Sequence, residues 1–397
     1  MLTGRYAHIT GWGAFVPERI VTNEDLAQLV PTSDQWIRER TGIAERRIAD
    51  EGTWTSTMGI EAGRRALRKA NLPPGELDLI ICATSTPDYL MPNTGSLIQN
   101  GLSANNAAAF DLNAACSGFV YGMAVGAAMI RSGTYDTVLV IGSEAMSRVM
   151  NWSDRATCVL FGDGAGAVLL QASDEPGGLL SSRLGSDGSG GELLTVGLGT
   201  RIPLTHQALA AGEPFLQMSG QQVFRFATRI MAQATGEVVE AADLQVADID
   251  LIVPHQANTR ILQVASKQLG LPIERIYSNL HRFGNTSAAS IPLALVDAIE
   301  EGRVHAGDHV VMVGFGGGLT WGACLIEWTF DPQDRTWSAR QRSVRWTRAR
   351  IARARRLLHQ VDRKLAALGG RWGRERADRP GPWDGSDGTV PSAKDQA

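Results

Sequence analysis

The sequence predicts an α/β protein made of two similar halves. Its 397 residues are 44% hydrophobic, which is enough to bury one large core or two smaller cores that are fused together. Short β-branched runs alternate with Ala-rich helical stretches across residues 1–330, a pattern typical of strands that helices cover on both faces. Residues 77–83 and 138–141 are expected strands of this kind.

An internal repeat indicates the two halves. A gap-free shift of 172 residues superposes three similar segments: 79–81 on 251–253, 138–142 on 310–314, and 113–116 on 285–288. Three matches in one register indicate two copies of one α/β unit, which we place at residues 1–175 and 176–330. If Cys116 begins a helix in the first copy, Asn285 lies near the start of the matching helix in the second, so the repeat would bring both into one cleft.

The start of the chain and its longest uncharged stretch favour a cytoplasmic protein. Residues 1–17 alternate like a strand followed by a turn and do not resemble a signal peptide. Residues 114–130 are rich in Gly and Ala and fall slightly short of the roughly 20 apolar residues that cross a bilayer. We expect them to form a buried helix.

Residues 331–397 differ from the rest in charge and pattern. They carry 16 Lys and Arg against 8 Asp and Glu, a net charge of +8, whereas residues 1–330 carry 22 against 33, a net charge of −11. Two apolar series that step by seven between residues 344 and 368 predict a basic amphipathic helix. The residues after Trp372 are rich in Pro, Gly and Asp and are expected to be disordered. The helix would bind an anionic membrane or an acidic partner, or pack on the acidic core or a dimer partner.

The four cysteines are Cys82, Cys116, Cys158 and Cys324. They lack the spacing of metal ligands, and a chain of this size does not need disulfides, so we expect neither. Three of them lie in apolar strand-like runs, where a buried, unreactive thiol is the ordinary interpretation. Cys116 instead precedes an apolar helix, whose N-terminus would lower the pKa of the thiol below about 8.5. A small buried cysteine in a Gly/Ala helix is an equally good interpretation of this position alone.

Other candidate residues lie at the ends of apolar runs. His255 directly follows a strand of the second copy, where α/β proteins place residues that face a ligand, although a lone histidine there is usually structural. Asn285 precedes an apolar helix, where Asn is also an ordinary cap or turn residue. Glycines 316–318 interrupt a strand pair, which favours close approach of the backbone to another group. Residues 161–166 lack the spacing of a nucleotide-binding loop, so we expect a tight turn.

Taken in order, the segments around Cys116, His255, Asn285 and the triple glycine resemble β-ketoacyl-acyl carrier protein synthase III of the thiolase-like superfamily. The matching segments read Asn-Ala-Ala-Cys-Ser-Gly-Phe, Pro-His-Gln-Ala-Asn, Gly-Asn-Thr-Ser and Phe-Gly-Gly-Gly, and the likeness spans about residues 1–330. The resemblance implies a thiolase-like five-layer αβαβα fold of two pseudo-repeated halves, and a homodimer. The shift of 172 residues agrees with this fold.

The same resemblance implies a catalytic site. Cys116, His255 and Asn285 would be the catalytic residues, and the backbone N–H groups of Cys116 and Gly317 would form the oxyanion hole. Condensing relatives that extend long chains carry a second histidine where this chain has Asn285, so the initiating type of enzyme is favoured. No metal or redox cofactor is implied.

The resemblance also assigns three groups of binding residues. Coenzyme A would contact Trp36, Arg40, Thr41, Arg155, Gly220 and Phe224, with the adenine between Arg155 and Trp36. The acyl carrier protein would dock at Arg225, Arg260 and Lys267. The acyl pocket would be lined by Met91, Met146 and Phe161, with Met91 reaching across the dimer. The family pattern has Asn where this chain has Gln221, which puts one contact to the pantetheine in doubt.

The expected reaction is a decarboxylative Claisen condensation of an acyl-coenzyme A primer with malonyl-acyl carrier protein, through an acyl-Cys116 intermediate. Its product would be a 3-oxoacyl-acyl carrier protein, and the reaction would initiate fatty acid synthesis. A condensing enzyme of secondary metabolism, or an acyltransferase on the same scaffold, is the nearest alternative. A non-catalytic scaffold subunit is disfavoured because all three catalytic side chains are present. The motifs do not specify the primer or its chain length.

Overall fold

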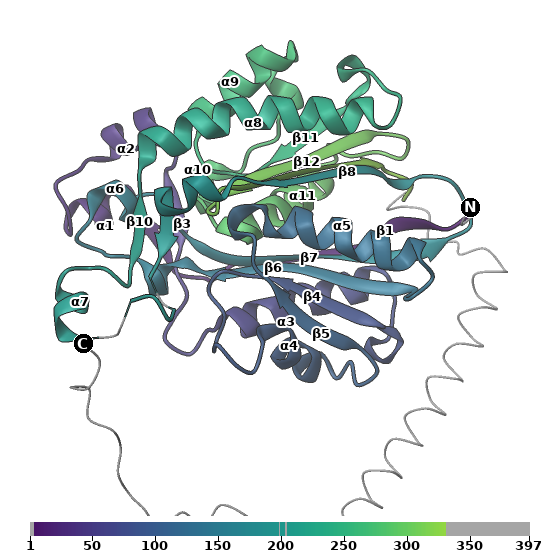
Figure 1. Ribbon diagram of the computed structural model, residues 1–397, viewed down its shortest axis with the longest axis horizontal. Coiled ribbons are helices and arrows are strands. Elements are labelled where there is room, and N and C mark those ends of the chain that lie inside the picture. The colour runs from purple at the N-terminus through teal and green to yellow at the C-terminus, as the bar shows by residue number, and fades with distance from the viewer. Residues whose placement is uncertain (1–3, 198, 203–204, 331–397) are drawn as a thin grey trace, which may run out of the picture. The chain divides into compact units, whose positions relative to one another are not determined.

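The computed structural model describes residues 4–197, 199–202 and 205–330. The amphipathic helix and the disordered tail predicted for residues 331–397 lie outside these residues. The described chain contains a five-stranded sheet, a four-stranded sheet and two small two-stranded sheets (Figure 1).

The five-stranded sheet has the order β1-β7-β6-β4-β5. Its strands are β1 (Tyr6–Phe15), β7 (Asp163–Ser173), β6 (Thr137–Ala145), β4 (Leu79–Ala83) and β5 (Ala108–Leu112). Side chains along β6 alternate between two apolar clusters: Val138 and Val140 face one, and Leu139 and Ile141 face the other. The unbroken apolar run in the sequence follows from this arrangement, because successive residues of a strand point to opposite faces and both faces are covered.

The four-stranded sheet has the order β11-β12-β13-β8. Its strands are β11 (Leu251–Pro254), β12 (His309–Gly316), β13 (Thr320–Glu327) and β8 (Gly178–Ser186). β11 and β12 are parallel, and the other two pairs are antiparallel. The strands of the first sheet therefore lie within residues 6–173 and those of the second within residues 178–327.

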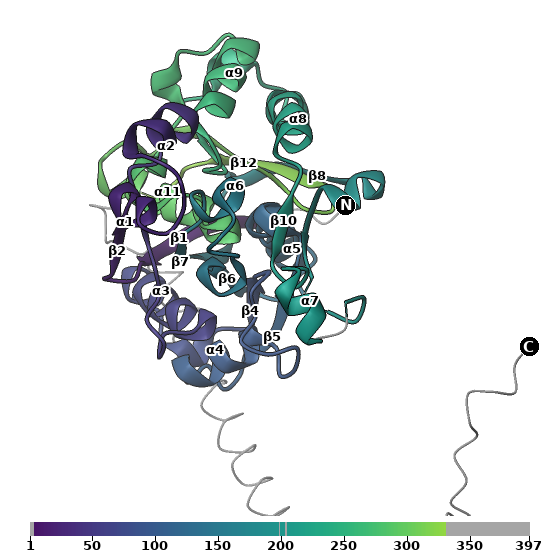
Figure 2. The ribbon, with the colours of Figure 1, turned by 90° about the vertical axis from the view of Figure 1, so that its left-hand side faces the viewer.

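Helices cover both faces of each sheet (Figures 1 and 2). The pairs are α3 (Thr55–Lys69) with α4 (Thr94–Leu102), α5 (Gly118–Arg131) with α11 (Ser290–Glu300), and α8 (Gly220–Glu240) with α9 (Thr259–Leu269). The first pair packs on the outer face of the first sheet, the second pair lies between the sheets, and the third packs on the outer face of the second sheet. This order of layers confirms the predicted five-layer αβαβα fold.

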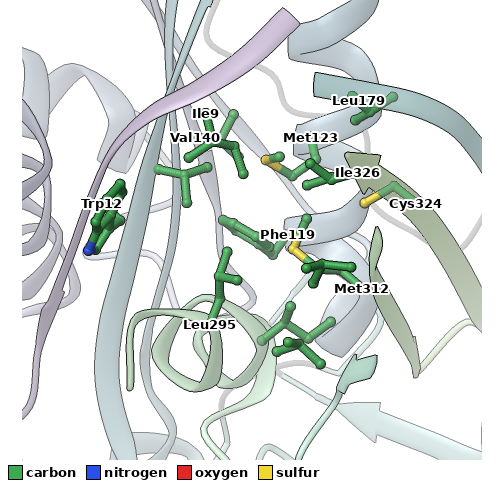
Figure 3. Packing of buried hydrophobic residues seen from close by; sticks show 14 of the residues in the cluster. Ile9, Trp12, Phe119, Met123, Val140, Leu179, Leu295, Met312, Cys324 and Ile326 are labelled. Atoms are coloured by element: carbon green, nitrogen blue, oxygen red, sulfur yellow. The ribbon is translucent and has the colours of Figure 1, made fainter. Parts of the chain in front are cut away.

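The central layer joins the two sheets through one apolar cluster. Figure 3 shows Phe119 of α5 and Leu295 of α11 among side chains of both sheets, including Val140 and Met312. Phe119, Val140, Leu295 and Met312 are all fully buried. The predicted buried helix of residues 114–130 is α5 and the short turn that precedes it.

The predicted repeat recurs in the positions of the elements. Five pairs begin 172 residues apart: β1 and β8, β4 and β11, β6 and β12, the 3-10 turns Ala115–Ser117 and Ser287–Ala289, and α5 and α11. The first residue of each 3-10 turn has left-handed backbone, with φ of 46° at Ala115 and 50° at Ser287. The two halves therefore match even in an uncommon backbone conformation.

Shorter elements lie at one end of the layers. They are β2 (Ile20–Thr22), α1 (Asn23–Ala27), α2 (Asp34–Thr41), β3 (Glu45–Arg47), α6 (Arg155–Cys158), β9 (Leu194–Val196), α7 (His206–Ala210), β10 (Leu216–Met218) and α10 (Leu280–Phe283). The prediction of a tight turn at residues 161–166 is wrong, because strand β7 already begins at Asp163. The glycines of this segment instead allow neighbouring backbone to approach closely. Phe161 instead forms a parallel bridge with Asn285.

Candidate active site

Cys116 lies in the 3-10 turn between β5 and α5, and its side chain is 6% exposed. Glycines of β12 allow the backbone of this turn to approach the second sheet. A Cβ atom on Gly316 would lie 2.6 Å from the Cys116 backbone nitrogen, and one on Gly314 would lie 3.3 Å from the Cys116 carbonyl oxygen. Gly316, one of the three glycines that the sequence singled out, and Gly314 are therefore needed for the close approach of the backbone.

The matching turn of the second half, Ser287–Ala289, packs against the first sheet in the same way. A Cβ atom on Gly142 of β6 would overlap the backbone of Ala288. Gly142 and Gly314 occupy equivalent places in the repeat, so each half supplies a glycine that admits the turn of the other half. The two turns consequently meet in the middle of the molecule.

The Cys116 thiol donates a hydrogen bond to Ser287 at 3.5 Å between Sγ and Oγ. The Ser287 hydroxyl in turn donates to Oε1 of Glu144 at 2.8 Å. Glu144 lies on β6 and has no exposed surface. The nucleophile candidate is thus connected through one hydroxyl group to a buried carboxylate.

The predicted lowering of the pKa of Cys116 is wrong. Burial raises the pKa of this thiol to about 12, and the charge of Glu144 acts in the same direction, although the hydrogen bond to Ser287 acts against it. Desolvation outweighs the field of the helix N-terminus because the second half of the chain covers the turn. Cys116 is therefore a neutral thiol at pH 7.

His255 follows the last residue of β11, as the sequence predicted, and is 1% exposed. Its Nδ1 lies 2.6 Å from Oγ of Ser290, the first residue of α11. The Phe315 ring packs edge-on against the imidazole, with 5.2 Å between the ring centroids. Burial lowers the pKa of His255 to about 3, so the ring is neutral at physiological pH.

Asn285 lies two residues before the start of the second turn and is 7% exposed. Its Oδ1 accepts a hydrogen bond from the Ser287 backbone N–H at 2.8 Å. Because the oxygen of the amide is engaged in this way, the NH₂ group is the part of the side chain that remains to donate to a ligand. The backbone of Asn285 is fixed by the bridge to Phe161.

One segment therefore brings the three candidate residues together. This segment contains Asn285, Ser287 and Ser290. The Asn285 side chain accepts from the backbone of the segment itself. The Ser287 hydroxyl contacts the Cys116 thiol, and the Ser290 hydroxyl contacts the His255 ring. Gly317, the second predicted oxyanion donor, lies directly after β12, whose last residue contacts the Cys116 turn. The Thr320 hydroxyl lies between this loop and the turn, 2.8 Å from the carbonyl oxygen of Ala114 and 3.0 Å from that of Gly317, and its one hydrogen is shared between these two acceptors.

Trp36 and Arg155, predicted to hold the adenine of coenzyme A, contact each other. The Arg155 guanidinium carbon lies 4.8 Å from the centroid of Trp36, and that of Arg40 lies 5.5 Å from it. An adenine ring stacked between Arg155 and Trp36 needs a separation of about 7 Å between these two groups, twice a contact of roughly 3.5 Å. Arg155 would therefore have to move to admit an adenine. Thr41 is 5% exposed, and its hydroxyl bonds within the chain to Ile37 and Ile43.

The predicted coenzyme A and carrier-protein residues occupy neighbouring elements (Figure 2). The end of α2 is joined to the start of α9, since Asn258 donates to the carbonyl of Arg40 and Arg260 donates to the carbonyl of Glu39, each at 2.9 Å. Gly220, Phe224 and Arg225 lie in the first turns of α8, which packs against α9. Arg225, Arg260 and Lys267 are all exposed.

The three predicted residues of the acyl pocket separate into two groups. Met146 and Phe161 are 3% exposed and belong to one apolar cluster. Met91 is 84% exposed and lies in the loop between β4 and α4. The expectation that Met91 reaches across a dimer stays a prediction.

Three further residues of the candidate site were not predicted from the sequence: Glu144, Ser287 and Ser290. Serines in a turn give no signal of their own. A glutamate inside the apolar run of β6 is a detectable signal, because a fully buried carboxylate is costly unless it is hydrogen-bonded.

Metal ligation and membrane insertion find no support in the described residues. No group of three His, Cys, Asp or Glu side chains among them has the arrangement of a metal site. Every helix within the same ranges is too short or too polar to serve as a bilayer span. All four cysteines are buried.

Comparisons with known proteins agree with the fold. The model of the 3-oxoacyl-[acyl-carrier-protein (ACP)] synthase III family matches residues 110–188, and the model of the C-terminal part of that family matches residues 239–328. A curated β-ketoacyl-[acyl-carrier-protein] synthase III from Roseiflexus sp. (strain RS-1) is 52% identical over 325 residues, covering 82% of this chain and 99% of the relative.

Two solved structures are similar throughout the described part of the chain. The 3-oxoacyl-[acyl-carrier-protein] synthase III from Aquifex aeolicus VF5 has a TM-score of 0.76 and 44% identity, covering 81% of this chain and all of the other. The priming β-ketosynthase of the R1128 polyketide biosynthetic pathway has a TM-score of 0.78 and 36% identity, covering 83% and 98%.

Fold and site together define a thiolase-like condensing enzyme, an acyltransferase. Within that class, the chain belongs to the β-ketoacyl-[acyl-carrier-protein] synthase III family. Its function is the condensing reaction of fatty acid synthesis.

Proposed function

We propose that this enzyme condenses an acyl-coenzyme A primer with malonyl-acyl carrier protein, and that Cys116 carries the acyl group between the two steps. The observation that supports this proposal most directly is the meeting of the two repeat-related turns. In this meeting the Cys116 thiol contacts Ser287, which belongs to the segment that also carries Asn285 and whose Ser290 contacts His255.

In the first half-reaction, Cys116 attacks the thioester carbon of the primer and coenzyme A leaves. The backbone N–H groups of Cys116 and Gly317 stabilise the oxyanion, and loss of one such donor typically lowers the rate by about 10² to 10³. The proximity of Gly316 to the Cys116 nitrogen supports this role, because it sets the loop that carries Gly317 beside the nucleophile.

In the second half-reaction, His255 and Asn285 donate hydrogen bonds to the thioester carbonyl of the malonyl group. Decarboxylation then gives a stabilised enolate, which attacks the acyl-Cys116. The amide orientation of Asn285 supports its role, since Oδ1 is already engaged with Ser287. Donation by Nε2 of neutral His255 requires that Nδ1 accepts the hydroxyl hydrogen of Ser290. In the structure this hydroxyl donates to the Ser287 carbonyl at 2.9 Å, so the Ser290 hydroxyl has to turn toward Nδ1 for this step. This chemistry uses no metal and no redox cofactor.

Substrate binding follows the predicted residues. Coenzyme A binds at Trp36, Arg40, Thr41, Arg155, Gly220 and Phe224, and the acidic carrier protein docks at Arg225, Arg260 and Lys267. The contacts between α2 and α9 support this division, because they set Arg40 and Arg260 on adjoining helix ends. Met146 and Phe161 line the acyl pocket. The enzyme acts in the cytoplasm as a homodimer.

A second candidate function is the priming condensation of a polyketide pathway. The 36% identity to the R1128 priming β-ketosynthase over nearly its whole length favours keeping it. Product analysis with acetyl-coenzyme A and malonyl-acyl carrier proteins from fatty acid and polyketide systems distinguishes the two functions. Selective turnover of the polyketide carrier would favour the second.

The primer is identified by intact-mass measurement after incubation with a panel of acyl-coenzyme A thioesters. We expect a mass increase equal to one acyl group, which is lost in the Cys116→Ala variant. Cys158→Ala is the matched control, since Cys158 is also buried but lies on α6. Adduct formation that survives in Cys116→Ala would contradict the proposed nucleophile.

A further inference from the structure

Glu144 is a fully buried carboxylate that faces only hydrogen-bond donors. Its two oxygens accept from the side chains or backbone N–H groups of Thr84, Ser85, Thr86, Ser287 and Ala288. No lysine or arginine of the described residues stabilises the charged form of Glu144, and burial raises the pKa of its carboxyl group. Glu144 is thus a charged acceptor held by neutral groups, in a site where uptake of a proton would relieve the cost of burial.

The directions of the hydrogen bonds around Glu144 are fixed by their outer partners. The Thr84 hydroxyl accepts from the Thr86 N–H, and the Thr86 hydroxyl accepts from the Ala145 N–H, so both hydroxyl hydrogens point to the carboxylate. The Ser287 hydroxyl likewise accepts from the Cys116 thiol and donates to Glu144. The result is a row of hydrogen bonds that runs in one direction, from the Cys116 thiol through Ser287 to the Glu144 carboxylate.

We propose that Glu144 takes up, through Ser287, the proton that Cys116 loses when it attacks a thioester, and holds that proton while Cys116 is acylated. Glu144 is in this sense a positioning residue, because it acts through Ser287 and does not touch the reacting atoms. The inference rests on the function proposed above.

The step balances in atoms and charge. The Cys116 proton moves to Ser287 Oγ while the Ser287 proton moves to Glu144 Oε1, and the sulfur bonds to the acyl carbon. The bond from that carbon to the coenzyme A sulfur breaks, and coenzyme A leaves as a thiolate that takes a proton from solvent. When the carbanion attacks, the bond to Cys116 Sγ breaks, the sulfur keeps the electron pair, and Glu144 returns the proton through Ser287.

Other titratable groups face this region without joining the chain. Cys82 on β4 lies in the fields of Glu144, Asp111 on β5 and Asp88 in the loop after β4, and burial raises its pKa well above the usual range. Asp88 accepts from Ser56 and Asp111 from the N-terminus of α4. His255 is neutral at physiological pH. None of these groups has a hydrogen bond to Ser287 or Glu144 among the described contacts.

The test is the pH dependence of Cys116 alkylation by iodoacetamide in the full-length protein, followed by intact mass. In the wild type the proton moves from Cys116 to Glu144 along the hydrogen bonds, and no proton is exchanged with solvent. The alkylation rate should therefore be nearly constant at pH values between the pKa of Glu144 and the pKa of the Cys116 thiol. In Glu144→Gln and in Ser287→Ala the proton must go to solvent. Both variants should react at least tenfold more slowly at pH 7, with a rate that rises about tenfold per pH unit.

A purely electrostatic role of Glu144 predicts the opposite sign. Removal of its charge would lower the pKa of Cys116, so Glu144→Gln would react faster than the wild type, and the wild-type rate would itself rise with pH. Either result overturns the proposal. The wild-type profile alone decides the matter if a variant does not fold.

Asp163→Asn is the matched control. Asp163 is another fully buried carboxylate, and it accepts from the backbone of Ala49 and from Ser147, with no link to Cys116. We expect this variant to keep the wild-type pH profile. A profile that changes as in Glu144→Gln would show a general effect of losing a buried carboxylate and would overturn the assignment to Glu144.

Infrared difference spectra of acylated minus free enzyme give an independent measurement. A carboxylic acid carbonyl band should appear on acylation of the wild type and be missing in Glu144→Gln. Acylation without this band would overturn the proposal. Failure of Cys116 to acylate at all would instead contradict the proposed function, and the alkylation profile would still test the proton chain.

Discussion

Cys116 combines the position of a nucleophile with surroundings that favour its neutral form. Burial raises the pKa of the Cys116 thiol to about 12, and no described cation acts against this shift. The thiolate is therefore a minor species at pH 7, and removal of the proton becomes part of the reaction. The reactivity of Cys116 thus depends on its hydrogen-bond partners more than on the N-terminus of α5.

Replacement of Cys116 by Ala should abolish condensation and leave some decarboxylation of malonyl-acyl carrier protein. The reason is that His255 and Asn285, the proposed donors for the enolate, remain in place. Release of labelled CO₂ and formation of the 3-oxoacyl product, measured on the same sample, check this expectation. Undiminished product formation would rule out Cys116 as the nucleophile.

His255 should make the fold sensitive to acid. Its pKa is about 3 in the folded chain and about 6.5 when unfolded, so between these values the unfolded chain binds more protons. The stability that neutral His255 allows is complete above pH 6.5 and is lost as the pH falls toward 3, at up to about 1.4 kcal/mol per pH unit. Urea unfolding of the wild type and of His255→Gln between pH 7 and pH 5 isolates this contribution.

The variant should show the weaker pH dependence, since all other groups titrate in both proteins. Parallel pH profiles of the two unfolding free energies would contradict the low pKa of His255. The nearness of Cys116, His255 and Asn285 could be predicted from their motifs and the repeat, and their catalytic roles stay predictions. The rise in the pKa of Cys116 could not, because the burial comes from residues of the other half.

At the scale of elements, the site depends on two turns that meet. Each turn opens with a left-handed residue and leads directly into a central helix, α5 for the first turn and α11 for the second. Each lies against a glycine of the opposite sheet, Gly314 for one and Gly142 for the other. The spacing of the site is therefore set by backbone contacts, which side-chain motifs describe only indirectly.

Gly316→Ala should destabilise the fold and slow acylation of Cys116. The added Cβ would lie 2.6 Å from the Cys116 nitrogen and 2.9 Å from the Ala115 Cβ, and such overpacking costs about 1–3 kcal/mol. Gly236→Ala in α8 is the control. A Cβ there meets nothing within 4 Å, so a gain of about 0.5–1 kcal/mol is expected.

Chemical denaturation and the rate of acyl-adduct formation measure both effects. Equal stability of Gly316→Ala and the wild type would show that the turn adjusts freely.

The strands and the central helices could be predicted from apolar runs and the repeat. The role of residues 161–166 could not, because Gly162 and Gly164 look like turn residues until their neighbours in space are known.

At the scale of the whole molecule, one edge of the first sheet stays open. β5 pairs with β4 and with no other described strand. Beside it, the loop that leads to α4 exposes Leu90 and Met91, each at 84%, and its end is tied to Asp111 of β5 through Thr94. Open edges and exposed apolar side chains are usually covered in soluble proteins, which supports the proposed homodimer.

Light scattering should give twice the chain mass of 42.6 kDa for the wild type. Leu90→Glu should shift the protein toward the single-chain mass, because a charge would be buried at the interface. Ile273→Glu, at a side chain that is 42% exposed near α9, should remain dimeric. A dimer that tolerates Leu90→Glu would place the interface elsewhere.

The repeat has a consequence for the ancestry of the site. Two copies of the same turn occur in each chain, yet one presents a thiol at its second position and the other a hydroxyl at its first. In an association of identical single-copy units, any substitution in the turn would appear on both sides at once. In a chain that holds both copies the two turns can differ, and here one presents the Cys116 thiol while the other accepts its hydrogen bond.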